Sequence, residues 1–401
     1  MAIEHYTESQ IKAKKMFETE QAILITGKPG TGKTELIEDY RERQVALGKR
    51  VLVTASTGLA ATNLNGGRTI HSALKWHPNA EAYDYDYCVE ILKGTDILII
   101  DEVSMMDASI INHLNRCLNY VTWCPQLIMS GDFFQLPPVT PSGNERVYPF
   151  ELPAWKELDL KPCVLEDVVR QKDPEFKEML EKAMLGDESC VSYFNDNTHQ
   201  NLIDGAITLC TRNDFTAERN KHMFDALPGV AKSYFATGDV EEADFEHSRV
   251  PKCLSVKINM RVMAIRNDSL GRYQNGSLGT VVDMAEDSIR VRFDNGIETD
   301  IYRIQYEIDK VIKDSVKMAV INQFPLLGGY AITIHKSQGQ TFDYINIKAP
   351  YCWDPGQLYV ALSRARSVNG IHLMNSIQPD SLITDPKVIA YYNSLCNRNV
   401  A

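Results

Sequence analysis

Residues 22–34 read AILITGKPGTGKT. The first five residues form an apolar, β-branched run, and a helical pattern starts at the end of the glycine-rich segment. A GxxxxGK[ST] string between a strand and a helix surrounds phosphate groups with backbone N–H groups at a helix N-terminus. This stretch therefore predicts an α/β fold with a parallel sheet and a nucleotide site at the carboxyl end of its first strand.

The chemistry of the loop gives roles to two side chains. Lys33 supplies a point charge to the β- and γ-phosphate oxygens, and Thr34 offers a hydroxyl group to Mg²⁺. The cofactors expected from this motif are therefore ATP and Mg²⁺. The other loop residues expected to line the nucleotide are Gly27, Pro29, Gly30, Thr31 and Gly32.

Similar β-rich runs occur at 50–55, 96–101 and 126–132, separated by helical patterns. Strands that alternate with helices indicate βαβ units and a parallel sheet covered on both faces. A polar, tyrosine-rich segment interrupts this order, and we interpret residues 72–95 as a small inserted wedge. We assign residues 1–168 to this first lobe.

Strand and helix patterns start again after Arg170, which indicates a second α/β lobe. Residues 254–311 differ, because they contain closely spaced β runs joined by hairpin dipeptides at Asn275-Gly276 and Asn295-Gly296. We predict a small inserted β-barrel there. The second lobe then consists of residues 169–253 and 312–401.

An acidic pair follows the apolar run 96–100. At the carboxyl end of a parallel strand, Asp101 is placed to hold Mg²⁺ and Glu102 to orient and deprotonate the attacking water. The same pair on its own would be read as a helix cap. The phosphate loop favours the catalytic interpretation.

Three further polar residues are candidates for the ATPase centre. Gln135 follows the next strand, where its amide can sense the γ-phosphate. Arg170 and Arg364 lie in the second lobe, and their guanidinium groups can neutralise charge in the transition state if that lobe faces the first across ATP. Each arginine taken alone would be read as a surface residue.

Composition limits the function classes. The formal net charge of −11 argues against a polycationic nucleic-acid coat, so any nucleic-acid path must be a local groove. We see no apolar run long enough to span a membrane and no targeting segment, so we expect a cytoplasmic protein. Nine scattered cysteines without a CxxC pair argue against a zinc site or a disulfide framework.

Seven segments in order resemble the motifs of superfamily-one helicases of the Pif/RecD-like branch, and are most similar to the Pif family. The resemblance covers nearly the whole chain. The matching segments are GKPGTGKT, TASTGLAATNL with GGRTIHS, DEVSM, GDFFQLPPV, VVRQKDPEF, ITIHKSQGQT and YVALSRARS.

The resemblance implies two RecA-like lobes, a wedge in the first and a Src-homology-like barrel in the second. It implies an ATP-dependent helicase that moves 5′ to 3′ on single-stranded DNA and unwinds duplex, in replication, recombination, repair or telomere maintenance. It also implies that Gln10 reads adenine and that Gly339 and Gln340 lie near the phosphates or ribose. The expected partners are single-stranded DNA and duplex junctions, with a monomer in the absence of DNA.

One segment departs from the family pattern. Residues 119–125 are compact where the family has a longer stretch ending in a Pro-Phe-Gly-Gly-like turn. The subfamily therefore stays open, as does any preference for G-quadruplexes, RNA–DNA hybrids or forks.

An acidic protein can hold a single strand through hydroxyls, amides, a few cations and stacking rings. The loops at the ATP edge of each sheet supply the candidate residues, and Pro138 is expected to support the path of the strand. Trp76 or Tyr85 in the wedge is expected to face the duplex junction, unless these rings pack internally. The nucleic-acid candidates are Thr57, Gly58, Asn63, Arg68, Thr69, His71, Phe133, Pro137, His335, Lys336, Ser337 and Gln338.

Two other functions compete with this prediction. A related ATPase could translocate or remodel complexes without separating strands, and a scaffold subunit could carry a decayed site. The intact Lys33, Asp101, Glu102 and Arg364 argue against the scaffold. An RNA track also stays open, because no residue pattern here reads a 2′-hydroxyl.

Overall fold

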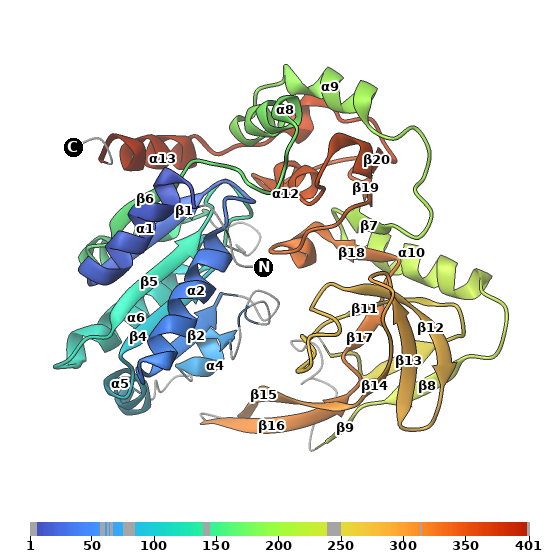
Figure 1. Ribbon diagram of the computed structural model, residues 1–401, viewed down its shortest axis with the longest axis horizontal. Coiled ribbons are helices and arrows are strands. Elements are labelled where there is room, and N and C mark those ends of the chain that lie inside the picture. The colour runs from blue at the N-terminus through green and yellow to red at the C-terminus, as the bar shows by residue number, and fades with distance from the viewer. Residues whose placement is uncertain are drawn as a thin grey trace.

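The structure is a computed structural model (Figure 1). It describes residues 6–56, 61, 64, 67–74, 85–138, 145–238, 250–312 and 315–398.

The first lobe contains a six-stranded sheet in the order β3-β2-β4-β5-β1-β6, with every pair parallel. Its strands are β1 (Ala22–Gly27), β2 (Val51–Ala55), β3 (Arg68–Thr69), β4 (Ile97–Asp101), β5 (Gln126–Gly131) and β6 (Lys161–Leu165). Its helices are α1 (Glu8–Thr19), α2 (Lys33–Ala46), α4 (Ile70–Ala73), α5 (Tyr85–Lys93), α6 (Ala108–Tyr120) and α7 (Pro153–Glu157), with short 3₁₀ turns η1 (Val103–Met105) and η2 (Pro149–Glu151).

Alternation along β1 explains the two layers of helices. Ile23 and Ile25 join one apolar core, which also holds Leu36 of α2, whereas Leu24 joins the other core with Leu114 of α6. Successive side chains of a strand point to opposite faces, so a strand that is apolar at every position is covered on both sides. The sheet predicted from residues 22–26 is therefore confirmed.

The second lobe contains a four-stranded parallel sheet in the order β18-β7-β19-β20. Its strands are β7 (Ile207–Cys210), β18 (Ala331–Thr333), β19 (Ile345–Lys348) and β20 (Ile371–Leu373). Its helical segments are α8 (Pro174–Leu185), α9 (Cys190–Asn197), α10 (Asn213–Ala226), η3 (Ile334–Ser337), α12 (Gln357–Ser363), η4 (Val368–Gly370) and η5 (Pro379–Ser381). Two parallel α/β lobes are thus present, as the sequence predicts.

Between β7 and β18 the chain forms antiparallel structure, at the lower right of Figure 1. Five strands pair in the order β14-β13-β12-β11-β17, and they are β11 (Arg261–Ala264), β12 (Leu278–Met284), β13 (Ser288–Phe293), β14 (Glu298–Tyr302) and β17 (Leu326–Gly328). Two smaller sheets join β8 (Lys232–Phe235) to β10 (Cys253–Val256) and β15 (Ile304–Ile312) to β16 (Ser315–Gln323) and β9 (Thr237–Gly238).

Both Asn-Gly dipeptides lie in turns, with φ of 87° at Gly276 and 84° at Gly296. The barrel predicted from the sequence ends at residue 311, but the long hairpin β15–β16 continues beyond it, because the strand pairing extends to Gln323. Antiparallel structure therefore extends to Gly328, and the parallel sheet resumes at Ala331. The exact domain limits stay predictions.

The C-terminal helix α13 (Pro386–Arg398) corrects one assignment. Its place in the chain predicts that it belongs to the second lobe, but it lies against the first (Figure 1). The Tyr391 ring stacks on Phe150 at 4.1 Å between centroids and meets Phe133 edge-on at 5.3 Å. Val388 and Leu395 are buried in the same core, so apolar burial holds this helix on the first lobe.

Most of the predicted wedge, residues 75–84 with Trp76, lies outside the described residues, as does the side chain of Tyr85. Among the helices that the structure describes, none combines the length and the apolar character needed to span a bilayer.

Candidate nucleotide site and nucleic-acid path

The phosphate loop joins β1 to the N-terminus of α2. Gly30 and Gly32 have φ of 80° and 84°, a left-handed conformation that favours glycine. Space adds to this requirement, since a Cβ atom on Gly30 would lie 2.5 Å from Cβ of Arg170, and one on Gly32 would lie 2.7 Å from Nε2 of Gln10. The loop is therefore packed directly against two other predicted site residues.

Lys33 is the first residue of α2. Its ammonium group donates hydrogen bonds to the carbonyl oxygens of Gly27 (2.7 Å) and Lys28 (3.0 Å), so it sits inside the loop. Burial lowers the pKa of this ammonium, while Asp132, Glu102 and Asp101 oppose that shift. A phosphate anion would favour the charged form in the same way.

The carboxyl ends of β4 and β5 bring three carboxyl groups together. Burial raises the pKa of Asp101, and burial and the Asp101 charge raise the pKa of Glu102 to about 7. Burial also raises the pKa of Asp132. Groups with such shifted pKa values in a cavity are suited to binding a metal ion or transferring a proton.

Backbone geometry directs Glu102 toward the site. It has φ 53° and ψ 44°, which is unusual for a residue with a side chain. Its amide N–H donates to Oδ1 of Asp101 (2.9 Å), and its carbonyl oxygen accepts from the Ser56 hydroxyl (2.6 Å). The turn after β4 is therefore fixed on both sides.

Gln135 lies beside Asp132, and its Nε2 donates to Oδ2 of that carboxyl at 3.3 Å. Its Oε1 is buried without a protein hydrogen-bond partner. A buried acceptor of this kind fits a ligand or water that donates a hydrogen bond, as a nucleophilic water does.

Arg364 ends α12 and is 1% exposed. Its Nε donates to the Val360 carbonyl (2.9 Å), and its Nη2 donates to the Ser363 hydroxyl (2.8 Å). Burial lowers the pKa of the guanidinium, whereas Glu102 raises it. The side chain is therefore held rigidly and faces the acidic group of the first lobe.

Arg170 reaches the site from the crossing between the lobes. The amide N–H groups of Val169 and Arg170 donate to the Gly30 carbonyl at 2.8 and 3.2 Å. Burial and the neighbouring Arg364 lower the pKa of Arg170, and its Nη1 is buried without a protein hydrogen-bond partner. A half-buried and a fully buried guanidinium group side by side favour an anion between them.

One cavity of about 400 Å³ between the two lobes is lined by Lys33, Glu102, Gln135, Arg170 and Arg364. The first lobe contributes the phosphate loop, Glu102 and Gln135, and the second contributes Gly339, Thr341, Arg364 and Arg366. Thr34 is exposed at its edge, which leaves the hydroxyl accessible to a metal ion. The volume is that of a small-molecule site, so the predicted nucleotide residues converge in space.

Gln10 supports the loop from α1. Thr7 and Gln10 form a capping box, and Gln10 Nε2 donates to the Thr31 carbonyl at 2.9 Å. Gln10 is 1% exposed in this arrangement. The structure therefore places it against the phosphate loop, and its reading of adenine stays a proposal.

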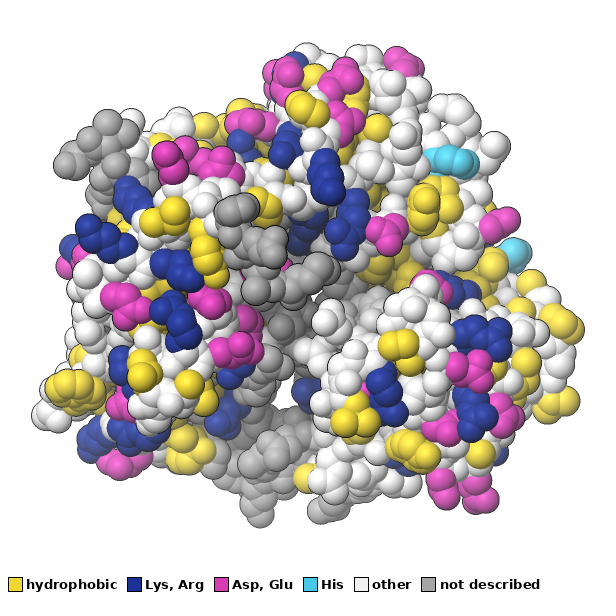
Figure 2. All heavy atoms as spheres, in the orientation of Figure 1, with side chains coloured by type: hydrophobic (Ala, Val, Ile, Leu, Met, Phe, Trp, Pro, Cys, Tyr) yellow, Lys and Arg dark blue, Asp and Glu magenta, His cyan; other side chains and the backbone are white. Residues whose placement is uncertain are grey.

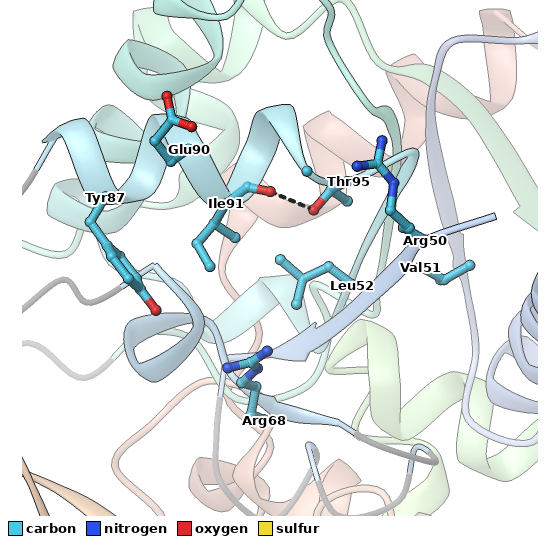
Figure 3. Close-up of a pocket in the computed structure, with 9 residues that line it drawn as sticks. Arg50, Val51, Leu52, Arg68, Tyr87, Glu90, Ile91 and Thr95 are labelled. Atoms are coloured by element: carbon cyan, nitrogen blue, oxygen red, sulfur yellow. Dashed lines mark hydrogen bonds between the residues drawn. The ribbon is translucent and has the colours of Figure 1, made fainter.

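Arg68 is exposed on β3, and Thr69 and His71 are half-buried. Arg68 lines a second cavity of about 420 Å³ together with Tyr87 of α5 and Arg50 (Figure 3). Thr57, Gly58 and Asn63 lie outside the described residues. Within the described part of this loop, Arg68 is thus the cation available to a phosphate backbone.

Phe133 and Pro137 correct the predicted path, because both are buried. The Phe133 ring is edge-on to Phe150, Trp155 and Tyr391 at 5.3, 5.9 and 5.3 Å. The ring is 5% exposed, so it offers no open face on which a base could stack. The prediction that Phe133 binds nucleic acid is therefore wrong, although it does support the loop above it.

In the second lobe, η3 and the residue that follows it present the four predicted residues in different ways. Lys336 is exposed, and His335 lies 3.8 Å from Asp354, with its pKa lowered by burial. Ser337 is turned inward, its hydroxyl donating to the Ile334 carbonyl at 2.7 Å. Gln338 is 5% exposed, and both polar atoms of its amide lack a protein partner.

Lys and Arg side chains gather on the surface below α8, beside the line where the lobes meet (Figure 2). A local patch of this kind on a chain of net charge −11 agrees with a narrow path in place of a broad basic surface.

Four residues at the site were not singled out from the sequence. Asp132 follows β5 at the same sheet edge as Asp101, and this position was the available signal. Asp354 joins the lobes through an ion pair with Arg146 at 2.7 Å, which no local pattern indicates. Thr341 and Arg366 lie within the segments ITIHKSQGQT and YVALSRARS, but the residue pattern gave them no role of their own.

Two protein-family models and several known proteins match this chain. The family model for PIF1-like helicase matches residues 6–188, and that for the UvrD-like helicase C-terminal domain matches residues 328–368. The chain is 32% identical to the ATP-dependent DNA helicase Pif1 of Bdellovibrio bacteriovorus, covering 96% of this chain and 90% of that protein. It is 31% identical to the human ATP-dependent DNA helicase PIF1, covering 94% of this chain but 61% of the human protein.

Among solved structures, the fold is similar to Pif1 helicase from Bacteroides in complex with ADP-AlF3 and single-stranded DNA. The TM-score is 0.76 at 29% identity, and the alignment covers 98% of each chain.

Proposed function

The chain belongs to the PIF1-like helicase family, and on that premise we propose that it is an ATP-dependent DNA helicase that moves 5′ to 3′ along single-stranded DNA. The observation that carries the proposal is the cavity between the lobes, because it combines a phosphate loop and acidic residues from one lobe with arginines from the other. A site divided in this way couples occupancy by a nucleotide to the distance between the lobes.

We propose the following division of labour for hydrolysis. Lys33 binds the β- and γ-phosphates, and Glu102, ionised, accepts the proton of the attacking water, which Gln135 orients. Arg170 and Arg364 neutralise charge on the transferred phosphoryl group, as their place in the lining of the cavity supports.

The donor set also fits Mg²⁺, since a threonine hydroxyl and a carboxylate are hard oxygen ligands. Thr34 and Asp101 would hold the ion, and when bound with ATP it would neutralise phosphate charge. The other steps depend on the side chains already named.

Movement along the DNA strand follows from closure and reopening of the nucleotide cavity between the lobes. Gly339 and Thr341 of the second lobe line the nucleotide cavity, and the predicted DNA residues 335–338 directly precede them in the chain. Closure of the cavity around ATP therefore moves the second lobe's grip on the strand relative to Arg68 in the first. We further propose a monomer in the absence of DNA and a location in the cytoplasm, where cysteine thiols stay reduced.

The test is strand displacement on duplexes with either a 5′ or a 3′ single-stranded tail, alongside ATP hydrolysis with and without single-stranded DNA. We expect unwinding from the 5′ tail and DNA-stimulated hydrolysis, both lost in Lys33→Ala. Unwinding from the 3′ tail alone would overturn the polarity. Stimulated hydrolysis without displacement would make the protein a translocase.

A further inference from the structure

Three potential metal ligands meet in the first lobe, away from the nucleotide cavity. They are Cys88 of α5 and His113 and Cys117 of α6, and their ligand atoms all lie within 4.8 Å of one another. His113 and Cys117 are four residues apart on one helix, so they share a face, and α5 packs against that helix. The lack of a CxxC pair argued against a zinc site, but sequence spacing does not reveal that Cys88 lies beside His113 and Cys117.

The distances suit a single ion. Cys117 Sγ and His113 Nε2 are 3.5 Å apart. A tetrahedral Zn²⁺ with ordinary Zn–S and Zn–N bonds would separate a sulfur and a nitrogen ligand by about 3.6 Å. The three side chains therefore need little movement to share one ion.

The apolar surroundings of the three side chains favour a metal site with no net charge. Cys88 and Cys117 are 0% exposed and His113 is 4% exposed, and both cysteines belong to the large apolar core of the lobe. A net charge in such a core is unfavourable. Two thiolates, one neutral imidazole and a divalent cation sum to zero, whereas a monovalent cation would leave one negative charge.

We propose that Cys88, His113 and Cys117 form a structural site for one thiophilic divalent cation of the Zn²⁺ type, with water in the fourth tetrahedral position. The ion joins α5 to α6. It thereby fixes the C-terminal part of the predicted wedge, because residues 85–93 of that wedge form α5.

A neighbouring residue links this site to the surface. Tyr87 precedes Cys88 on α5 and lines the second cavity together with Arg68 (Figure 3). Metal binding would therefore hold Tyr87 at a fixed position relative to the exposed Arg68. The site does not depend on ATP hydrolysis, so it can be tested separately from the proposed function.

The experiment measures metal content on the full chain, purified without a metal-binding tag and dialysed after addition of Zn²⁺. We expect about one zinc per chain, and a thiolate-to-metal charge-transfer band when Co²⁺ replaces it. The double variant His113→Gln, Cys117→Ser should lose at least nine-tenths of the bound metal and the band. Cys163→Ser, which alters a buried cysteine of the same lobe, should keep both.

If the double variant fails to fold, the metal site is tested on the wild-type chain by removing Zn²⁺ with a chelator and then adding it back. Chelation should expose two further thiols to alkylation and lower the thermal midpoint, and Zn²⁺ should reverse both changes. Absence of bound metal would overturn the proposal, as would a Cys88–Cys117 disulfide seen as a loss of two hydrogens in mass. Metal that stays in the double variant would do the same.

Discussion

Replacing Glu102 by glutamine should make the protein more stable and less active. Burial and the Asp101 charge raise the pKa of Glu102 from 4.5 to about 7. The folded state therefore holds this proton more tightly than the unfolded chain, so stability falls as pH rises from about 4.5 to about 7 and stays level above that.

The magnitude follows from the shift. A difference of about 2.5 pKa units corresponds to about 3 kcal/mol of destabilisation by the ionised carboxyl at pH 8. Glutamine has the same shape without the charge, so Glu102→Gln should recover much of this. For a chain of this length, about 3 kcal/mol raises the thermal midpoint by about 3 °C.

The assay compares thermal unfolding of the two proteins without nucleotide at pH 5 and pH 8. We expect the midpoint difference to appear at pH 8 and to shrink toward zero at pH 5, where the wild-type carboxyl is protonated. ATP hydrolysis should fall by about 10²–10⁴-fold, because the general base is lost.

Glu35→Gln is the matched control. Glu35 is an exposed residue that lines the same cavity, so its replacement should leave both the midpoint and its pH dependence unchanged. The reasoning is refuted if Glu102→Gln lowers the midpoint at pH 8, or if it raises the midpoint equally at both pH values.

Three other substitutions test the site and the C-terminal helix. Arg364→Ala should reduce ATP turnover about 10³-fold or more, with ATP affinity nearly retained. Arg366→Ala alters an exposed arginine of the same cavity and should change ATP turnover by less than about tenfold. Near-normal turnover in Arg364→Ala would exclude its assigned role. Gly32→Ala should weaken ATP binding in a calorimetric titration, because its Cβ would lie 2.7 Å from the Gln10 amide at a φ of 84°; unchanged affinity would mean that this loop rearranges on binding. Tyr391→Ala should destabilise the first lobe by about 3 kcal/mol in urea unfolding, as expected for a packed aromatic ring, and an unchanged midpoint would show that α13 does not hold to that lobe in solution.

Much of the nucleotide site could be predicted because its residues follow strands. The phosphate loop after β1 and the acidic pair after β4 occupy one sheet edge in any parallel arrangement, so local patterns were sufficient. Arg364 could be named from its motif. Its burial could not, since that depends on packing between α12 and the first lobe.

Contacts between distant parts of the chain were the features that escaped prediction. The Tyr391 ring stacks on Phe150, and no short sequence pattern relates these two residues. The same holds for Cys88, which meets His113 and Cys117 only because α5 packs on α6. Phe133 was misread because a ring beside a functional motif serves either the core or a ligand, and only tertiary packing decides which.

The return of α13 to the first lobe limits how the lobes can move. The chain passes from the first lobe to the second between β6 and α8, and passes back between η5 and α13. Because two separate chain crossings connect the lobes, the lobes rotate most easily about the axis that passes through both crossings. Hydrolysis at the cavity should therefore drive a swing about one axis, and cutting the chain between Ser381 and Pro386 should release twisting motions that the intact protein does not make.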